Sequence, residues 1–535
     1  MVVKALVGRI SVFGRVGESE LERSRPLSGL LRRPGRRSAA SLPGKRAVAL
    51  AICALAAGAA RPANAAVAAA PPVSKETQQC LDCHTVYTPA LVQDWMHSLH
   101  SQTTPQDALK KRPLERRMSS TNIPESLSGV VVGCYECHGL NATNHTDNFD
   151  HFDLHINVVV SPPDCQICHE VEAQQFAGSK KAHALGNLDS NPLFHTLVES
   201  ITSVAEIRDG KVAPVGSSDL TKDETCYGCH GSRVRVVGTR KLDTELGEVV
   251  LPRLTNWPNQ GVGRVNPDGS RGACTACHPR HEFSIEVARK PFTCSQCHRG
   301  PDVPAWEVYE ESKHGNIFNS KAQEWNWDRV PWRVGQDFRA PTCAACHNSL
   351  LTAGDVVAPR THDFGARLWV RLFGLPCTHP QPKSGDTSLI RNKAGQPLPT
   401  TFAGEPAAEF LIDATEQTRR QAVMVGVCRS CHNRDWADGH FAKLASTIQE
   451  TDRMTRSATD LMQRAWDLGL ADKTNPFDET IERQWLRQWL FYADSIRLSS
   501  AMIGPDHASF EDGWFDMTTH LREMQEWIDA KEKSK

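Results

Sequence analysis

The motif Cys-x-x-Cys-His occurs eight times in this chain of 535 residues. The copies are Cys80, Cys83 and His84; Cys134, Cys137 and His138; Cys165, Cys168 and His169; Cys226, Cys229 and His230; Cys274, Cys277 and His278; Cys294, Cys297 and His298; Cys343, Cys346 and His347; Cys428, Cys431 and His432. A shuffled chain of this composition would contain roughly 0.02 copies. The motifs use 16 of the 18 cysteines, so no other feature constrains the fold as strongly.

The order of the three reactive residues in each motif indicates haem attachment. Two thiols add across the two vinyl groups of a haem, and the adjacent histidine binds the iron from one face. Zinc ribbons also use Cys-x-x-Cys pairs, but zinc needs no histidine after every second cysteine. A disulfide scaffold does not need one either. The sequence therefore predicts eight covalently bound c-type haems, with the eight motif histidines as iron ligands.

The other 14 histidines can supply the opposite faces of the irons. Seven are expected to ligate: His100, His155, His183, His281, His314, His362 and His440. Seven are expected to be ordinary surface or hydrogen-bonded residues: His97, His145, His151, His195, His379, His507 and His520. Seven ligands for eight irons would leave one open coordination position, where a small ligand could be transformed.

The N-terminal residues 1–65 are predicted to be a secretory signal peptide. A long basic leader precedes the apolar stretch Ala47–Ala60, and Ala63-Asn64-Ala65 forms a small-x-small cleavage signal. This places the mature protein in the periplasm. No apolar run approaches the roughly 20 residues of a membrane span, and a formal charge of −1 argues against a nucleic-acid partner.

The remaining chain is expected to form an octahaem domain at 66–434 and a helical segment at 435–535. About 59 residues per haem are too few for a separate domain around each cofactor, so the haems should share one packed body. After residue 434 cysteines are absent, and tryptophan, leucine and methionine recur at helical spacing. We expect three long helices with breaks near Pro476 and Pro505. The predicted fold is mainly α, with a C-terminal bundle of long helices and little β.

Together with the eight motifs, a central stretch resembles a known family. The stretch runs from Trp257-Pro258-Asn259 through Cys274 to His278-Pro279-Arg280-His281-Glu282-Phe283-Ser284, then Cys294–His298, Gly300-Pro301-Asp302 and Glu310–Gly315. It is similar to hydroxylamine oxidoreductase and its octahaem relatives. The resemblance implies a periplasmic, mainly helical homotrimer that acts on small nitrogen compounds. It also implies that the fourth motif (Cys226, Cys229, His230) carries the catalytic haem and that the other haems are bis-histidine wires.

The sequence departs from the hydroxylamine-oxidising members of this family. Those members carry a tyrosine in the C-terminal segment that cross-links to the active haem, whereas residues 501–510 contain none. The family's distal Asp-His pair and a further tyrosine are replaced by Asn259-Gln260 and Phe338. A cross-linked haem is therefore not expected. Asp268, in the loop before the fifth motif, is a candidate catalytic carboxylate.

Three functions remain open at this point. The first is oxidation of hydroxylamine or a related compound at the fourth haem, with electrons passing to a cytochrome or a quinone-linked partner. The second is reduction of nitrite or hydroxylamine at the same iron, which the missing tyrosine favours. Arg264, Arg280 or Lys313 would then help to bind an anion, although each could equally pair with a haem propionate. The third is electron relay without catalysis, with the last iron closed by a further histidine.

Overall fold

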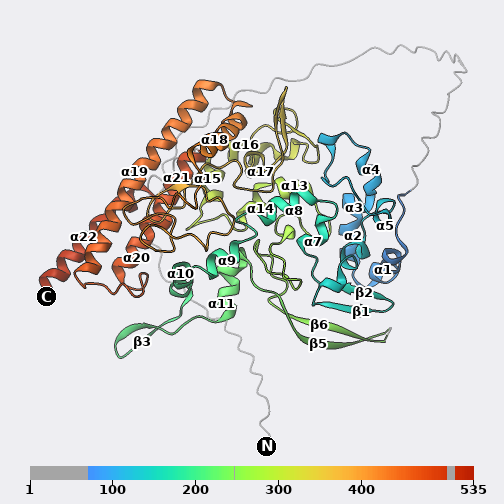
Figure 1. The fold of residues 1–535 in the computed structure, drawn as a ribbon, viewed down its shortest axis with the longest axis horizontal. Helices are drawn as coiled ribbons and strands as arrows, with labels where there is room; N and C mark the ends of the chain where they lie inside the picture. Colours follow the sequence, from blue (N-terminus) through green and yellow to red (C-terminus); the bar gives the residue numbers. More distant parts are fainter. Residues whose placement is uncertain (1–69, 246, 503–511) are drawn as a thin grey trace, which may run out of the picture. The chain divides into compact units, whose positions relative to one another are not determined.

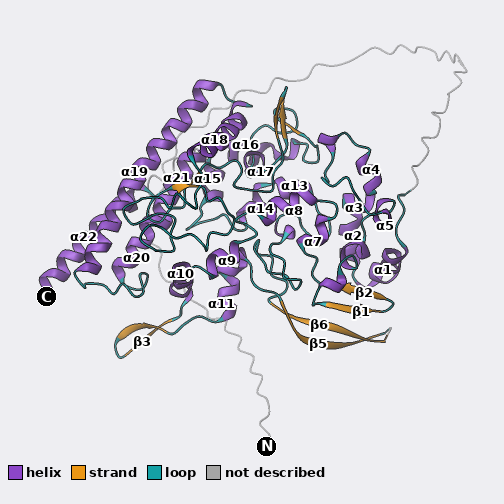
Figure 2. Ribbon diagram, in the orientation of Figure 1, coloured by secondary structure: helices purple, strands orange, loops and turns teal. Residues whose placement is uncertain are grey.

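The computed structural model describes residues 70–245, 247–502 and 512–535 (Figure 1). The predicted signal peptide, Pro505 and His507 lie outside these residues. Ala68–Lys535 forms one compact unit. Helices dominate it and strands are few and mostly short (Figure 2), which confirms the prediction of a mainly α fold with little β.

Short helices make up the part of the unit that carries the motifs. They are α1 (Lys75–Tyr87), α2 (Pro89–His97), α3 (Leu99–Gln102), α4 (Pro105–Leu109), α5 (Glu125–Ser128), α6 (Cys134–His138), α7 (Pro162–Gln166), α8 (Glu170–Ala177), α9 (Ala184–Asp189), α10 (Pro192–Thr202), α11 (Asp219–Glu224), α12 (Cys226–His230), α13 (Ile285–Arg289), α14 (Pro291–Ser295), α15 (Ala305–Glu311), α16 (Lys313–Lys321) and α17 (Cys343–His347). Most have only one or two turns, so tertiary packing rather than helix propensity must hold them.

Local capping explains where several motif helices begin. The side chain of Thr342 accepts a hydrogen bond from the Ala345 amide at the start of α17. Pro162 and Pro291 stand at the first positions of α7 and α14, where a missing N–H costs nothing. In one helical turn the second cysteine and the histidine lie three and four residues after the first cysteine. All three side chains therefore share one face.

The strands pair locally. They are β1 (Asn148–His151), β2 (Leu154–Asn157), β3 (Ala205–Arg208), β4 (Lys211–Pro214), β5 (Arg235–Thr244), β6 (Gly247–Thr255), β7 (Trp332–Arg333), β8 (Leu351–Ala353), β9 (Val356–Ala358), β10 (Val370–Arg371) and β11 (His379–Pro380). The pairs β1–β2, β3–β4, β5–β6 and β10–β11 are antiparallel, and β7, β8 and β9 form a three-stranded sheet. None of them forms a larger layer.

Longer helices begin just before the last motif and continue after it. They are α18 (Ala414–Arg429), which carries Cys428, then α19 (Arg434–Asp467), α20 (Thr480–Arg487), α21 (Ala493–Met502) and α22 (Trp514–Ser534). A single π-turn over Gln488–Tyr492 joins α20 to α21. The helix α22 packs against α19, as Figure 1 shows in red and orange. The segment at 435–535 therefore forms three rods: α19, the continuous α20–α21, and α22. The break between α19 and α20 contains Pro476, as predicted.

Aromatic and aliphatic side chains fill the interior of the C-terminal rods. The main cluster includes Met462, Trp466, Ile481, Trp485 and Ile528, which are almost entirely buried. No described helix is long and apolar enough to cross a bilayer.

Candidate functional site

One continuous cavity of about 2180 Å³ runs through the part of the unit that carries the motifs. All eight motif histidines line it, together with 15 of the 16 motif cysteines. Its other lining residues are largely apolar, including Val92, Phe176, Leu197, Phe338 and Leu444. The eight motifs therefore face one shared interior, as expected for cofactors that are packed together.

Four motif histidines have a second histidine ring opposite them. The pairs are His84 with His151 (ring centroids 6.1 Å apart), His169 with His100 (6.3 Å), His278 with His362 (6.5 Å) and His432 with His314 (6.2 Å). Imidazole nitrogens bind metals at about 2 Å, so two axial nitrogens stand about 4 Å apart and their ring centroids somewhat over 6 Å apart. Each pair therefore leaves the gap that one iron requires.

Backbone carbonyls orient other rings for ligation. The Nδ1–H groups of His138 and His230 donate to the carbonyls of Asn157 (2.8 Å) and Ala184 (3.2 Å). This fixes the tautomer in which Nε2 carries the free lone pair, as in most metal-binding histidines. For the second motif, His281 lies near enough that His138 lowers its pKa, after the larger effect of burial.

Two of the seven expected distal histidines do not line the cavity. His155 is partly exposed, and its Nδ1 lies 2.9 Å from the carboxylate of Asp150. His183 uses both ring nitrogens elsewhere: Nε2 donates to the Ala177 carbonyl, and Nδ1 accepts from Arg271. The structure therefore does not bring either residue opposite a motif histidine.

His440 lines the cavity, but its contact with the eighth motif is indirect. The ring of Trp436 stacks on His432 at 3.8 Å and on His440 at 5.5 Å. The ring contacts of the described residues give no opposing histidine for His230 or His347.

Two histidines that were expected to be ordinary residues are placed like ligands. His151 faces His84, as described above. His379 is 3% exposed and lines the cavity; its Nδ1–H donates to the Pro380 carbonyl, and its buried Nε2 has no hydrogen-bond partner. A buried nitrogen without a partner is costly unless a ligand or metal satisfies it.

The glycine-rich stretch before the fifth motif clamps the fourth motif. The Val262 and Gly263 amides donate to the carbonyls of Cys229 and His230. A Cβ on Gly263 would lie 2.7 Å from the His230 carbonyl oxygen, so only glycine allows this approach. Asn259 donates to the Tyr227 carbonyl, which makes it a support for the motif helix.

The two arginines near this motif that could bind an anion also make structural contacts. Arg264 is 1% exposed; it donates to Asn266 and to the Asn259 carbonyl, and it lies over the Trp257 ring. Burial lowers the pKa of Arg264 to about 10. Arg280 stacks on the same tryptophan. Both line the cavity, whereas Lys313 does not.

Asp268 belongs to a buried cluster around His145. Its carboxylate accepts hydrogen bonds from Ser161 and Ser270 and lies 3.9 Å from His145. It does not line the cavity. The structure thus places the predicted catalytic carboxylate in this hydrogen-bonded cluster and not on the wall of the cavity.

Three groups that the sequence did not single out line the cavity around the fourth motif: Arg371, Asp302 and Asp494. Burial lowers the pKa of His230; the Asp302 carboxylate opposes this shift and Arg371 adds to it. Burial also raises the pKa of Asp494 well above its usual value, although the Arg497 guanidinium, 3.6 Å from its carboxylate, opposes this shift. Its two oxygens are buried without a hydrogen-bond partner.

Contacts between thiols of different motifs give the spatial order of the motifs. The thiols of Cys80 and Cys134, of Cys165 and Cys274, of Cys229 and Cys297, and of Cys294 and Cys343 lie close enough to shift one another's pKa. The fourth motif is therefore adjacent to the sixth, and the sixth to the seventh.

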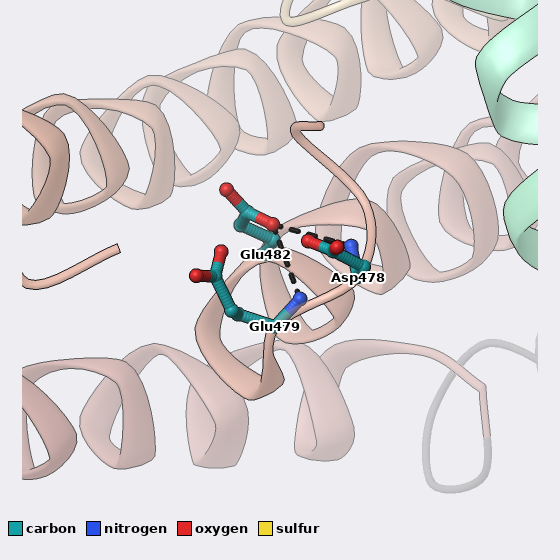
Figure 3. A group of neighbouring side chains, drawn as sticks. All are labelled: Asp478, Glu479 and Glu482. Atoms are coloured by element: carbon teal, nitrogen blue, oxygen red, sulfur yellow. Dashed lines mark hydrogen bonds between the residues drawn. The ribbon is translucent and has the colours of Figure 1, made fainter. Parts of the chain in front are cut away.

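A carboxylate cluster in the C-terminal rods is a helix cap. Asp478, Glu479 and Glu482 lie together at the start of α20 (Figure 3). Glu482 accepts the backbone N–H groups of Asp478 and Glu479, and its other oxygen accepts the indole N–H of Trp466. These bonds account for the position of the buried Glu482 carboxylate.

Known proteins share both the motifs and the fold. Residues 266–355 match the family "Seven times multi-haem cytochrome CxxCH", and residues 164–249 match "Cytochrome c554 and c-prime". A solved structure titled "Hypothetical multiheme protein" is 41% identical; the alignment covers 88% of this chain and 98% of that one, with a TM-score of 0.81. These similarities, with the geometry above, define a multihaem cytochrome c that binds haem covalently.

Two further relatives come from Kuenenia stuttgartiensis. A "Probable nitrite reductase-hydroxylamine oxidoreductase fusion protein" is 31% identical over 231 residues, which is 36% of this chain. This chain spans about a quarter of that relative's length, 27%. A structure of a "reducing HAO-like protein complex" has the same fold at 18% identity, with a TM-score of 0.55 and coverage of 86% and 85%. The chain is therefore a multihaem cytochrome c whose fold is similar to that of the hydroxylamine oxidoreductase-like complex.

Proposed function

We propose that the protein binds eight haems c, one at each Cys-x-x-Cys-His motif. The observation that carries this proposal is that all eight motif histidines line one cavity, four of them with a second ring at the separation of two axial ligands. Intact mass of the purified protein should exceed that of the polypeptide by eight haems. Seven or fewer in fully matured protein would contradict the proposal.

We further propose that the fourth motif carries the reactive haem and that the reaction runs in the reductive direction on a small nitrogen oxyanion such as nitrite. A haem iron with an open position binds such ligands and exchanges electrons with them. The residues around the fourth motif support this assignment. No described histidine ring opposes His230, while Arg371, His379 and Asp494 line the cavity. The absence of a tyrosine from residues 501–510 also favours reduction. This argument comes from the sequence, because residues 503–511 lie outside the described part of the chain.

The side chains around the fourth motif suit an anionic substrate that consumes protons. Arg371 brings a guanidinium, which binds oxyanions through a planar fork of donors. Lys180 lies close enough for Arg371 to lower its pKa, after the larger effect of burial, and the pKa falls to about 7. Burial raises the pKa of Asp494, which favours its protonated form, and a protonated carboxyl can supply a proton to a reductive step. The proximity of Cys229 to Cys297 places the sixth motif beside the fourth, so a haem at the sixth motif could pass electrons to the fourth.

Paired assays test the direction of the reaction. We expect purified protein to oxidise a reduced dye with nitrite faster than it reduces an acceptor with hydroxylamine. Arg371→Gln should lower the nitrite rate at least tenfold. The matched control is Lys383→Gln, which removes a cation that binds the exposed Glu409 carbonyl outside the cavity. Equal loss in both variants, or faster hydroxylamine oxidation by the wild type, would contradict the reductive assignment.

Electron relay without catalysis is the second candidate, and His379 favours it. The free, buried Nε2 of His379 would close an iron if it reached the fourth haem. The two proposals differ in their spectra. A reactive fourth haem gives a high-spin ferric signal in the resting protein, whereas a relay gives only low-spin signals. A wholly low-spin spectrum without nitrite reduction would establish the relay.

We also propose that the protein is exported to the periplasm and assembles as a homotrimer with a cytochrome or quinone-linked redox partner. Covalent haem attachment supports export, and the complex named for one structural relative supports assembly. The proposed octahaem domain, residues 66–434, ends where α19 begins at Arg434. Light scattering of the purified protein should give three times the mass of the mature chain, and a monomer would contradict the trimer.

A further inference from the structure

Three segments of the chain share a pattern of an aromatic residue, a serine three residues later, and a potential iron ligand two residues after the serine. They are Trp95-Met96-His97-Ser98-Leu99-His100, Phe176-Ala177-Gly178-Ser179-Lys180-Lys181 and Tyr309-Glu310-Glu311-Ser312-Lys313-His314. The first and third end in histidine. The second ends in lysine at the corresponding position.

The three segments also share one local structure. The hydroxyls of Ser98, Ser179 and Ser312 each donate to the carbonyl of the aromatic residue three positions earlier, at 2.6 Å in every case. The backbone N–H of each serine donates to the same carbonyl. All three serines are 2% exposed. Each segment therefore forms the same tight turn. The turn determines the direction of the side chain that stands two residues after the serine.

Two of these turns deliver a ring opposite a motif histidine. His100 lies opposite His169, and His314 opposite His432, at the ring separations given above. In the second turn the corresponding side chain is Lys181. Its Nζ lies 3.3 Å from Nε2 of His298, the histidine of the sixth motif. Nε2 is the atom that binds iron, so the amine stands on the side where the iron belongs.

We propose that Lys181 is the second axial ligand of the haem iron at the sixth motif. An unprotonated amine has one lone pair for the metal; on binding, the ammonium proton leaves to solvent and one Fe–N bond forms. Axial nitrogens stand about 4 Å apart across a metal, so the 3.3 Å contact needs to open by less than 1 Å, which the four-carbon lysine side chain allows. His183 is not available for this iron because both its nitrogens are bonded elsewhere.

The neighbouring Lys180 has the same side chain as Lys181 but does not approach His298. Lys180 lies one residue earlier and donates to the Oε1 of Gln381 at 2.8 Å, away from His298. Lys181 has the ring of Phe364 4.8 Å from its amine, an apolar neighbour that does not compete for the lone pair. A His/Lys iron would then stand beside the fourth motif, through the contact of Cys229 with Cys297. The axial ligand tunes a haem's potential, so this haem would differ from the bis-histidine ones.

Spectroscopy of the oxidised holoprotein tests this ligation without any assay of activity. Near-infrared magnetic circular dichroism and electron paramagnetic resonance separate His/Lys from His/His low-spin haems. We expect the wild type to show one haem of the His/Lys class. Lys181→His should convert it to a bis-histidine signal, since the same turn already delivers histidine twice. Lys181→Met should change the same signal to that of a His/Met or high-spin haem.

Lys180→Met is the matched control and should leave the His/Lys signal unchanged. The inference rests on haem attachment at the sixth motif, which the intact mass tests separately. A full complement of haems without a His/Lys signal in the wild type would overturn the ligation alone. Loss of that signal in Lys180→Met, with Lys181→His retaining it, would also overturn it. If Lys181→Met yields no mature protein, the wild type and Lys181→His still decide the question.

Discussion

The part of the unit that carries the motifs and the C-terminal rods fill their interiors in different ways. Trp485 of the rods packs against Trp466 and Trp489 and against Phe402 of the motif-bearing part, with ring centroids 5.5–6.2 Å apart. In the motif-bearing part, the interior is a cavity lined by cysteines, histidines and apolar side chains. The rods have a side-chain core, to which Leu197, Leu375 and Leu398 of the motif-bearing part also contribute, whereas most of the motif-bearing part depends on eight cofactors for its core. Folding of this part should therefore be coupled to haem attachment, and folding of the rods should not.

The largest expected effect comes from removing one attachment point at the centre of the motif-bearing part. The variant Cys294→Ser with Cys297→Ser should abolish most of the accumulated holoprotein, because these thiols adjoin both the fourth and the seventh motifs. The yield of haem-stained protein on a denaturing gel measures the effect. Any protein that survives should carry one haem fewer by intact mass.

Cys377 provides the control for that variant. It is buried but lies outside the eight motifs. Cys377→Ala should leave the haem count unchanged and lower the stability only slightly, since it removes one small sulfur atom. If the double variant accumulated as well as Cys377→Ala, the motif-bearing part would not depend on its cofactors for a core.

A smaller effect is expected from a cavity in the rods. Trp485→Ala removes a side chain that is 1% exposed, together with the hydrogen bond from its indole N–H to Thr459. Such substitutions cost about 3–5 kcal/mol. The melting temperature followed by far-ultraviolet circular dichroism should fall, while the haem count stays the same. Phe515→Ala on α22, where the ring is 64% exposed, should change the melting temperature little. Loss of haem in Trp485→Ala would show that the two parts are not independent.

The motifs and the rods could be predicted from sequence because each has a local signature. Cysteine spacing identifies haem attachment without reference to the fold, and helical periodicity identified the three rods. The distal ligands have no such signature. His151 and His155 lie on β1 and β2, and the register places His155 opposite Asp150 and His151 opposite Leu154. Since successive residues of a strand point to opposite faces, only the register decides which histidine faces His84.

The charged cluster around His145 could not be predicted from the sequence either. His145 was expected to be an ordinary histidine, and Asp268 to be catalytic. In the structure His145 lies 3.4 Å from both Asp147 and Asp164 and is almost fully buried. These carboxylates come from segments that only the tertiary fold brings together. The lysine at position 181 could have been found from sequence, because the aromatic-serine-ligand pattern repeats three times.

The smallest expected effect is also the one that depends on pH. Burial alone would lower the pKa of His145, but the carboxylates of Asp147 and Asp164, each 3.4 Å from the ring, outweigh it and raise the pKa to about 10. The folded protein thus binds this proton more tightly than the unfolded chain, whose histidine pKa is about 6.5. The stabilisation is complete below pH 6.5 and is lost as the pH rises toward 10. His145→Asn should therefore cost about 3 kcal/mol at pH 6 and clearly less at pH 9.5.

The measurement is the difference in melting temperature between His145→Asn and wild type at the two pH values. His195→Asn is the matched control, because His195 lies 3.7 Å from Asp189 with both side chains about half exposed. Exposed pairs contribute about 0–1 kcal/mol, so that variant should behave like wild type at both pH values. An equal penalty for His145→Asn at pH 6 and pH 9.5 would mean that shape rather than charge holds the cluster. In that case the His145 cluster would resemble the aromatic cluster around Trp485 in the rods, where packing dominates.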